Sequence, residues 1–162
     1  MKSNALRIVC SVIFAWWSLK SLDIAFRTES ADHQLYQAVG LGWLVLPAAL
    51  IVTILFAVTV IWIWRPFKLG YKLCILGLVT EMVMTVGAGI ISIANPDAAK
   101  SAFIASRESR GMSVQDEMIE MVASPVFGII AIILGVVFCG IAFFLITRLN
   151  RNLAKSDLST EN

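Results

Sequence analysis

The stretch LGYKLCILGLVTEMVMTVGAGIISIA, Leu69–Ala94, decides the fold of this chain. Its apolar residues form one nearly continuous run, with a single acid, Glu81, near the middle. About 20 such residues cross the ~30 Å hydrocarbon core of a bilayer as an α-helix. A strand of a membrane barrel would alternate polar and apolar side chains instead. The stretch therefore predicts a transmembrane helix that carries one carboxyl group in its interior.

Three further runs have the same character, at residues 6–25, 39–64 and 125–147. Of the 162 residues, 59% are hydrophobic and 15% are charged, a composition far from that of soluble domains. We therefore expect an all-α integral membrane protein, with a four-transmembrane-helix bundle in residues 1–150. The basic start of the first run also fits a signal peptide, but no small-residue cleavage site follows it. Residues 151–162 are expected to form a polar cytoplasmic tail.

Lysine and arginine residues near the ends of the runs predict the orientation of the chain. The two termini and the turn between the second and third runs carry Lys2, Arg7, Arg65, Lys68, Lys72, Arg148, Arg151 and Lys155. The other two loops carry fewer, namely Lys20, Arg27, Lys100, Arg107 and Arg110. Because cytoplasmic loops are enriched in these residues, we expect both termini in the cytoplasm. The sequence thus predicts a multi-pass protein of the cytoplasmic (inner) membrane.

The loop at residues 95–124 contains capping and stop residues typical of two short amphipathic helices. Asn95 or Asp97 can cap the first, and Gly111 can stop it. Ser113 followed by Asp116 fits a capping box that would open the second. We expect this outer loop to cover the bundle, with a lid or a docking surface for a partner as the alternatives.

Small residues align on two of the predicted membrane helices. At about 100° per residue, Gly77 and Glu81 share one face of helix 69–94 with Thr85, and a matching stripe on helix 125–147 comprises Gly128, Ala131, Gly135 and Cys139. Small side chains allow membrane helices to approach closely. We therefore expect Gly77, Gly128, Ala131 and Gly135 to form a helix-packing surface, with Glu81 turned into the bundle.

Glu81 is the central residue of a candidate proton or ion site. Thr85, Thr53 and Cys139 are expected at a similar depth and complete the candidate set. Lys20 shares a face with Ile13 and the two tryptophans that follow, so it is expected to point outward and to pair with Asp23. An unpaired acid at this depth should be protonated near neutral pH. Glu81 would then either donate an interhelical hydrogen bond worth about 0.6 kcal/mol or respond to protons and cations.

Other classes of function find little support in the sequence. The cysteines lie in apolar runs without metal or redox spacing, and His33 is the single histidine, so neither a metal nor a cofactor is expected. Paired aspartates and a serine with its base are lacking, which argues against an enzyme. The net charge of +2 gives no footprint for nucleic acid.

Two functions remain after these exclusions. The leading interpretation is a small accessory or scaffold subunit, in contact with the lipid bilayer and with a membrane protein partner or a second copy of the chain. The alternative is a proton-coupled small-solute transporter or channel that uses Glu81. A filled interior would favour the first, and a cavity that reaches Glu81 would favour the second.

Overall fold

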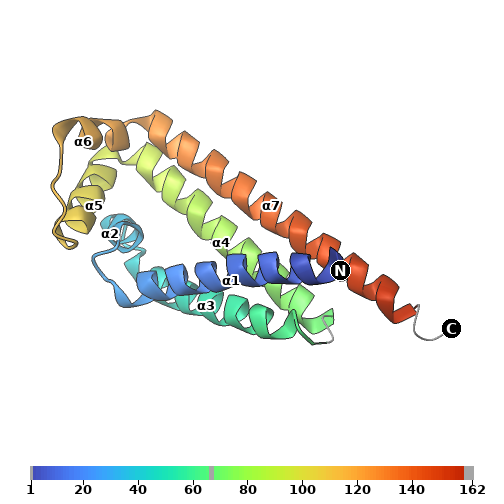
Figure 1. Ribbon diagram of the computed structural model, residues 1–162. Helices are drawn as coiled ribbons and strands as arrows, with labels where there is room; N and C mark the ends of the chain where they lie inside the picture. The colour runs from blue at the N-terminus through green and yellow to red at the C-terminus, as the bar shows by residue number, and fades with distance from the viewer. Residues whose placement is uncertain (1, 66–67, 159–162) are drawn as a thin grey trace.

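The computed structural model describes residues 2–65 and 68–158, and every regular element in this part of the chain is helical. The helices are α1 (Lys2–Phe26), α2 (Ala31–Ala38), α3 (Val45–Trp62), α4 (Lys68–Ala94), α5 (Pro96–Glu108), α6 (Asp116–Ala123) and α7 (Pro125–Leu158), with a 3-10 turn, η1, at Gly42–Leu44 (Figure 1). Four spans are long and apolar enough to cross a membrane, namely Asn4–Phe26, Gly42–Trp62, Leu69–Ala94 and Pro125–Ala154. The prediction of an all-helical chain with four membrane-spanning candidates is confirmed.

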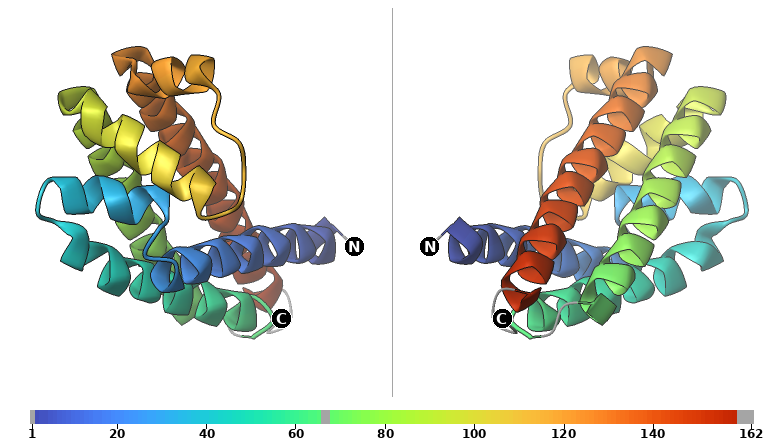
Figure 2. Two further views of the ribbon diagram at one scale, coloured as in Figure 1. Left: turned by 90° about the vertical axis from the view of Figure 1, so that its left-hand side faces the viewer. Right: turned by 90° about the vertical axis from the view of Figure 1, so that its right-hand side faces the viewer.

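The four long helices form two antiparallel pairs. α1 packs on α3, α4 packs on α7, and contacts between α3 and α4 join the pairs. The pairs meet near the turn between α3 and α4 and diverge toward the opposite end, where α2, α5 and α6 lie (Figures 1 and 2). α2 contacts α5, which in turn contacts α4 and α6. The short helices therefore fill the open end of a wedge.

Local capping explains where several helices begin, and it corrects one prediction. The Asn95 side chain accepts a hydrogen bond from the Ala98 amide at the start of α5. The expected capping box at Ser113 is wrong, because α6 begins after Gln115 without a side-chain cap. The Ser113 carbonyl instead accepts a hydrogen bond of 3.0 Å from Arg107 Nε, which ties this segment back to α5.

Two other boundaries differ from the sequence-based expectation. The run at 39–64 does not begin as a helix, because Gly40 adopts a positive φ of 76° between α2 and η1. α7 continues to Leu158, so the segment set apart as a tail starts as an extension of the last helix. Once an apolar helix is anchored, further turns add a hydrogen bond per residue without a new nucleation cost.

Two hydrophobic cores stabilise the two ends of the wedge. The core at the closed end comprises Cys10, Phe14, Val52, Phe56, Ile63, Cys74, Leu78, Ala142, Ile146 and Leu149. Gly77 packs here, because a methyl group at this position would lie 2.7 Å from the Phe56 ring of α3. The second core, under the short helices, comprises Leu35, Ala98, Ala99, Ala102 and Val122. The space between these cores holds the site described below.

α4 and α7 approach each other closely at paired glycines. A methyl group at Gly128 would lie 3.1 Å from the Gly89 carbonyl oxygen, and one at Gly89 would lie 3.2 Å from the Gly128 carbonyl oxygen. Further along α7, Gly135 lies against the Thr85 methyl group. Such close approach of backbones is typical of membrane helix pairs. Gly128 and Gly135 thus face the third long helix, whereas Gly77 on that helix faces α3.

Tyr36 fastens α2 to the middle of α4. Its hydroxyl donates a hydrogen bond of 2.8 Å to the Met84 carbonyl oxygen and occupies the space that a side chain at Gly87 would need. We expect Tyr36→Phe to lower the free energy of unfolding by about 0.5–1.5 kcal/mol, since the hydrogen bond is lost. Thermal unfolding of the purified protein would measure this loss.

A double-mutant cycle with Gly87 provides the control for this bond. Gly87→Ala should destabilise the wild type more than it destabilises Tyr36→Phe, because the added methyl group collides with the hydroxyl. Strictly additive losses would show that the hydroxyl does not occupy this position.

Candidate functional site

Glu81 forms an ion pair with Lys20 between α4 and α1. Lys20 Nζ lies 3.6 Å from Glu81 Oε1. The Glu81 side chain is 13% exposed and that of Lys20 is 52% exposed, so the lysine is the more accessible partner. Glu81 is the middle residue of the 27-residue α4. The pair therefore lies at the centre of a candidate membrane span.

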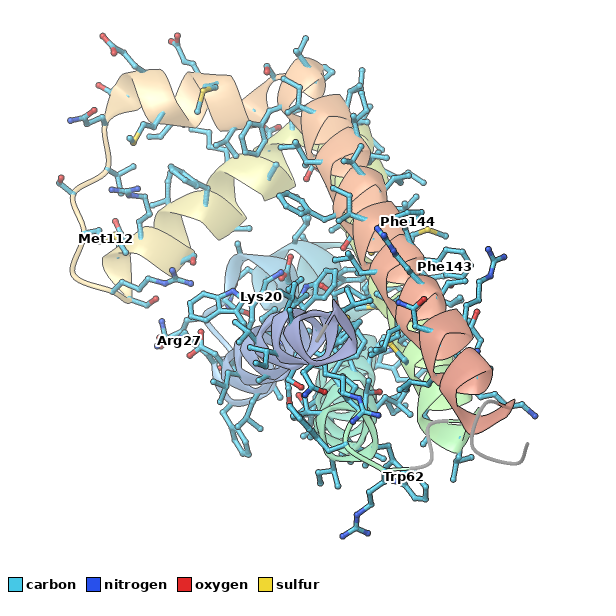
Figure 3. All side chains as sticks on the ribbon, turned by 45° about the vertical axis from the view of Figure 1, so that its right-hand side comes forward. Lys20, Arg27, Trp62, Met112, Phe143 and Phe144 are labelled. Atoms are coloured by element: carbon cyan, nitrogen blue, oxygen red, sulfur yellow. The ribbon has the colours of Figure 1, made fainter. Side chains whose placement is uncertain are left out.

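This pairing overturns the expectation for Lys20. Asp23 pairs with Arg27 at 3.2 Å, and Lys20 lies on α1 beside α2 (Figure 3). Lys20 does share a flank with Ile13 and Trp17, and this flank lines an open groove. The reason is that α1 packs mainly on α3, which leaves the flank turned toward α4 and α7. The expectation of a protonated Glu81 assumed that this acid is unpaired, and the ion pair with Lys20 shows that this assumption is wrong.

An outer cavity of about 350 Å³ lies between the two helix pairs, beneath the short helices. Most of its lining is apolar, and each of the helices α1 to α7 contributes residues to it. The polar side chains that line it are Lys20, Ser21, Asp32, Tyr36, Glu81, Thr85 and Ser92. These polar residues come from α1, α2 and α4, whereas the lining from α3, α5, α6 and α7 is apolar.

A groove of about 580 Å³ lies between α1, α4 and α7. Its walls are largely apolar and include Val12, Trp16, Phe138 and Ile141, each more than half exposed. Lys20, Glu81 and Thr85 line both the groove and the outer cavity. The ion pair therefore stands where the two spaces meet.

Asp32 is the third charged residue of the site. It lines the outer cavity from α2, and no ion pair with it occurs among the residues that the structure describes. Burial raises the pKa of Asp32, and the positive charge of Lys20 partly opposes this effect. The pKa of Tyr36 is also raised, first by burial and then by the negative charge of Asp32. The site thus contains one lysine and two acids.

The structure brings together three of the four residues in the candidate set. Glu81, Thr85 and Cys139 line the groove. Thr53 lies elsewhere, because its hydroxyl donates to the Ala49 carbonyl at 2.7 Å and its own carbonyl accepts from Ser18 at 3.0 Å. It joins α1 to α3 and lines neither space. Of the packing residues, Ala131 lines the outer cavity beside Gly128.

Sequence reasoning missed two members of the site, Lys20 and Asp32. A lysine inside an apolar run was a usable signal, but the face on which it lay was assigned to lipid. Asp32 gave no such signal, because it belongs to a polar loop segment whose path over α4 depends on the Tyr36 contact. In the described part of the chain, no group of three or more His, Cys, Asp or Glu side chains could hold a metal ion.

Comparison of the chain with known protein families, curated proteins and solved structures gave no match.

Proposed function

We propose that this chain is a proton-coupled small-solute transporter or channel of the cytoplasmic membrane, with both termini in the cytoplasm and Glu81 as its proton site. The observation that carries the proposal is the meeting of the groove and the outer cavity at the Lys20–Glu81 pair. A solute that reaches the pair from either space can alter its charge. Ionisable groups inside membrane spans are costly and mark proton or ion pathways. No catalytic step is assigned to the chain.

The three charges of the site suggest how a proton could be coupled to a solute. When Glu81 takes up a proton, its attraction for Lys20 is lost. Lys20 then turns toward Asp32, the other acid that lines the outer cavity. Loss of the pair removes the contact between opposite charges that joins α1 to α4. The proton thus controls whether the groove and the outer cavity communicate.

The second candidate is an accessory or scaffold subunit, and the outward face of α7 favours it. This face is apolar and about half exposed or more, at Val126, Ile129, Ile133, Val137 and Phe144. Lipid, a helix of another membrane protein or a second copy of the chain could cover it. Within the four-helix bundle, this reading gives the Lys20–Glu81 pair a purely structural task.

Labelling of Glu81 by a hydrophobic carbodiimide separates the two candidates, because this reagent needs a protonated, accessible carboxyl group. We expect labelling of the protein in lipid vesicles to rise as the pH is lowered and to disappear in Glu81→Gln. Mass spectrometry of the α4 peptide would locate the adduct. An unreactive Glu81 at every pH, in a protein that copurifies with a defined larger complex, would establish the scaffold reading and refute the proton site.

A further inference from the structure

The outer cavity holds one positive charge against two negative charges. Lys20, Asp32 and Glu81 line it together. None of the other residues that line the cavity carries a formal charge. When both acids are ionised, the cavity therefore carries a net charge of −1 within a mostly apolar lining. A single added positive charge would make it neutral.

We propose that the outer cavity binds a small monovalent organic ammonium ion between Asp32 and Glu81, in exchange for one proton. This inference rests on the proposed function and names the class of its solute. An inorganic cation would need several oxygen ligands, whereas most of this lining is carbon. An anion would raise the net negative charge of the cavity. The charge of the site thus selects a cation, and its lining selects an organic one.

The size and the aromatic content of the cavity fit this ligand class. Its volume of about 350 Å³ lies at the small end of the range for ligand pockets. Tyr36, Phe103 and Phe127 line it, and aromatic rings attract ammonium groups through their faces. Ile24, Leu35 and Met84 supply further apolar surface for the body of the ligand.

Proton exchange follows from the same balance of charge. Burial raises the pKa of Asp32, so without a ligand a proton neutralises this acid at a pH where an exposed aspartate is ionised. A bound ammonium favours the ionised form, and the proton leaves to solvent. The charged groups that face Asp32 across the cavity are Lys20 of α1 and Glu81 of α4, and Tyr36 is a further titratable group that lines it from α2 itself. Binding should therefore weaken as the pH falls.

Calorimetric titration of the purified protein with phenyltrimethylammonium tests the proposal, because the charge of this probe does not depend on pH. We expect its Kd to fall as the pH is raised, by up to about tenfold per pH unit where one proton is released. Titrations in buffers of different ionisation enthalpy would detect the released proton. Benzyl alcohol, an uncharged aromatic of similar size, should bind at least tenfold more weakly at the higher pH.

Two variants locate the binding site. Asp32→Asn should weaken binding at least tenfold and reduce its pH dependence to the part that Glu81 contributes, whereas Asp23→Asn, which alters the Asp23–Arg27 pair, should leave both unchanged. Absence of binding by the wild type at every pH, or equal binding of benzyl alcohol, would refute the ligand class. The wild-type titration decides this even if Asp32→Asn fails to fold. Carbodiimide labelling of Glu81 reports separately on the proton site, so failure of the ligand class and failure of the proposed function are distinguishable.

Discussion

Lys20→Met should destabilise the protein at alkaline pH and much less at acidic pH. The substitution removes the counter-charge of Glu81 and keeps most of the apolar length of the side chain. An ionised side chain at the centre of a membrane helix costs about 2.5–3.5 kcal/mol on insertion scales. We expect a loss of this size at alkaline pH. At acidic pH a proton neutralises Glu81 and the stability recovers. Equilibrium unfolding in lipid bicelles at both pH values would measure the difference.

Two further variants show whether the effect comes from the pair itself. Glu81→Gln combined with Lys20→Met should recover most of the lost stability at alkaline pH, since the double variant leaves no unpaired charge. Arg27→Met breaks the exposed Asp23–Arg27 pair and should cost at most about 1 kcal/mol. If Lys20→Met were no more harmful than Arg27→Met at alkaline pH, the two charges would not be coupled.

Gly128→Leu should separate α4 from α7 and lower the free energy of unfolding by at least about 1–3 kcal/mol, the cost of overpacking a close contact. A methyl group at Gly128 already lies 3.1 Å from the Gly89 carbonyl oxygen and 2.7 Å from Ile93 Cγ1. The isoleucine can change its rotamer, but the backbone carbonyl cannot move without shifting the helix. Thermal unfolding and the efficiency of a disulfide engineered between the two helices would both report the separation.

Gly140→Leu is the matched control on the same helix. A methyl group at Gly140 meets no described atom within 4 Å apart from neighbouring residues and the backbone of its own helix, and Gly140 itself is exposed. The substitution should therefore leave the stability nearly unchanged. Equal losses for the two variants would mean that helix propensity, and not the Gly89 contact, sets the effect at Gly128.

The sequence by itself determined the class of the protein and the position of its four long helices. Length and continuous apolar character are local properties, and a bilayer has few ways to accommodate them. The start of α5 is also a local property, because the Asn95 side chain accepts a hydrogen bond from the amide of Ala98, three residues later. The helical period put Glu81 and Thr85 on one face of their helix, and both line one groove together with Cys139.

Only the tertiary structure decided which charges meet. The partner of Lys20 depends on which helix α1 packs against, and a helical wheel shows the faces of α1 without showing what lies opposite them. Asp32 enters the site because α2 folds back over α4, through a hydrogen bond between residues 48 positions apart in the chain. Such long-range contacts have no local signal, since each depends on the packing of the whole wedge. An acid that the sequence left alone at the centre of a membrane helix thus acquires a lysine and a second acid.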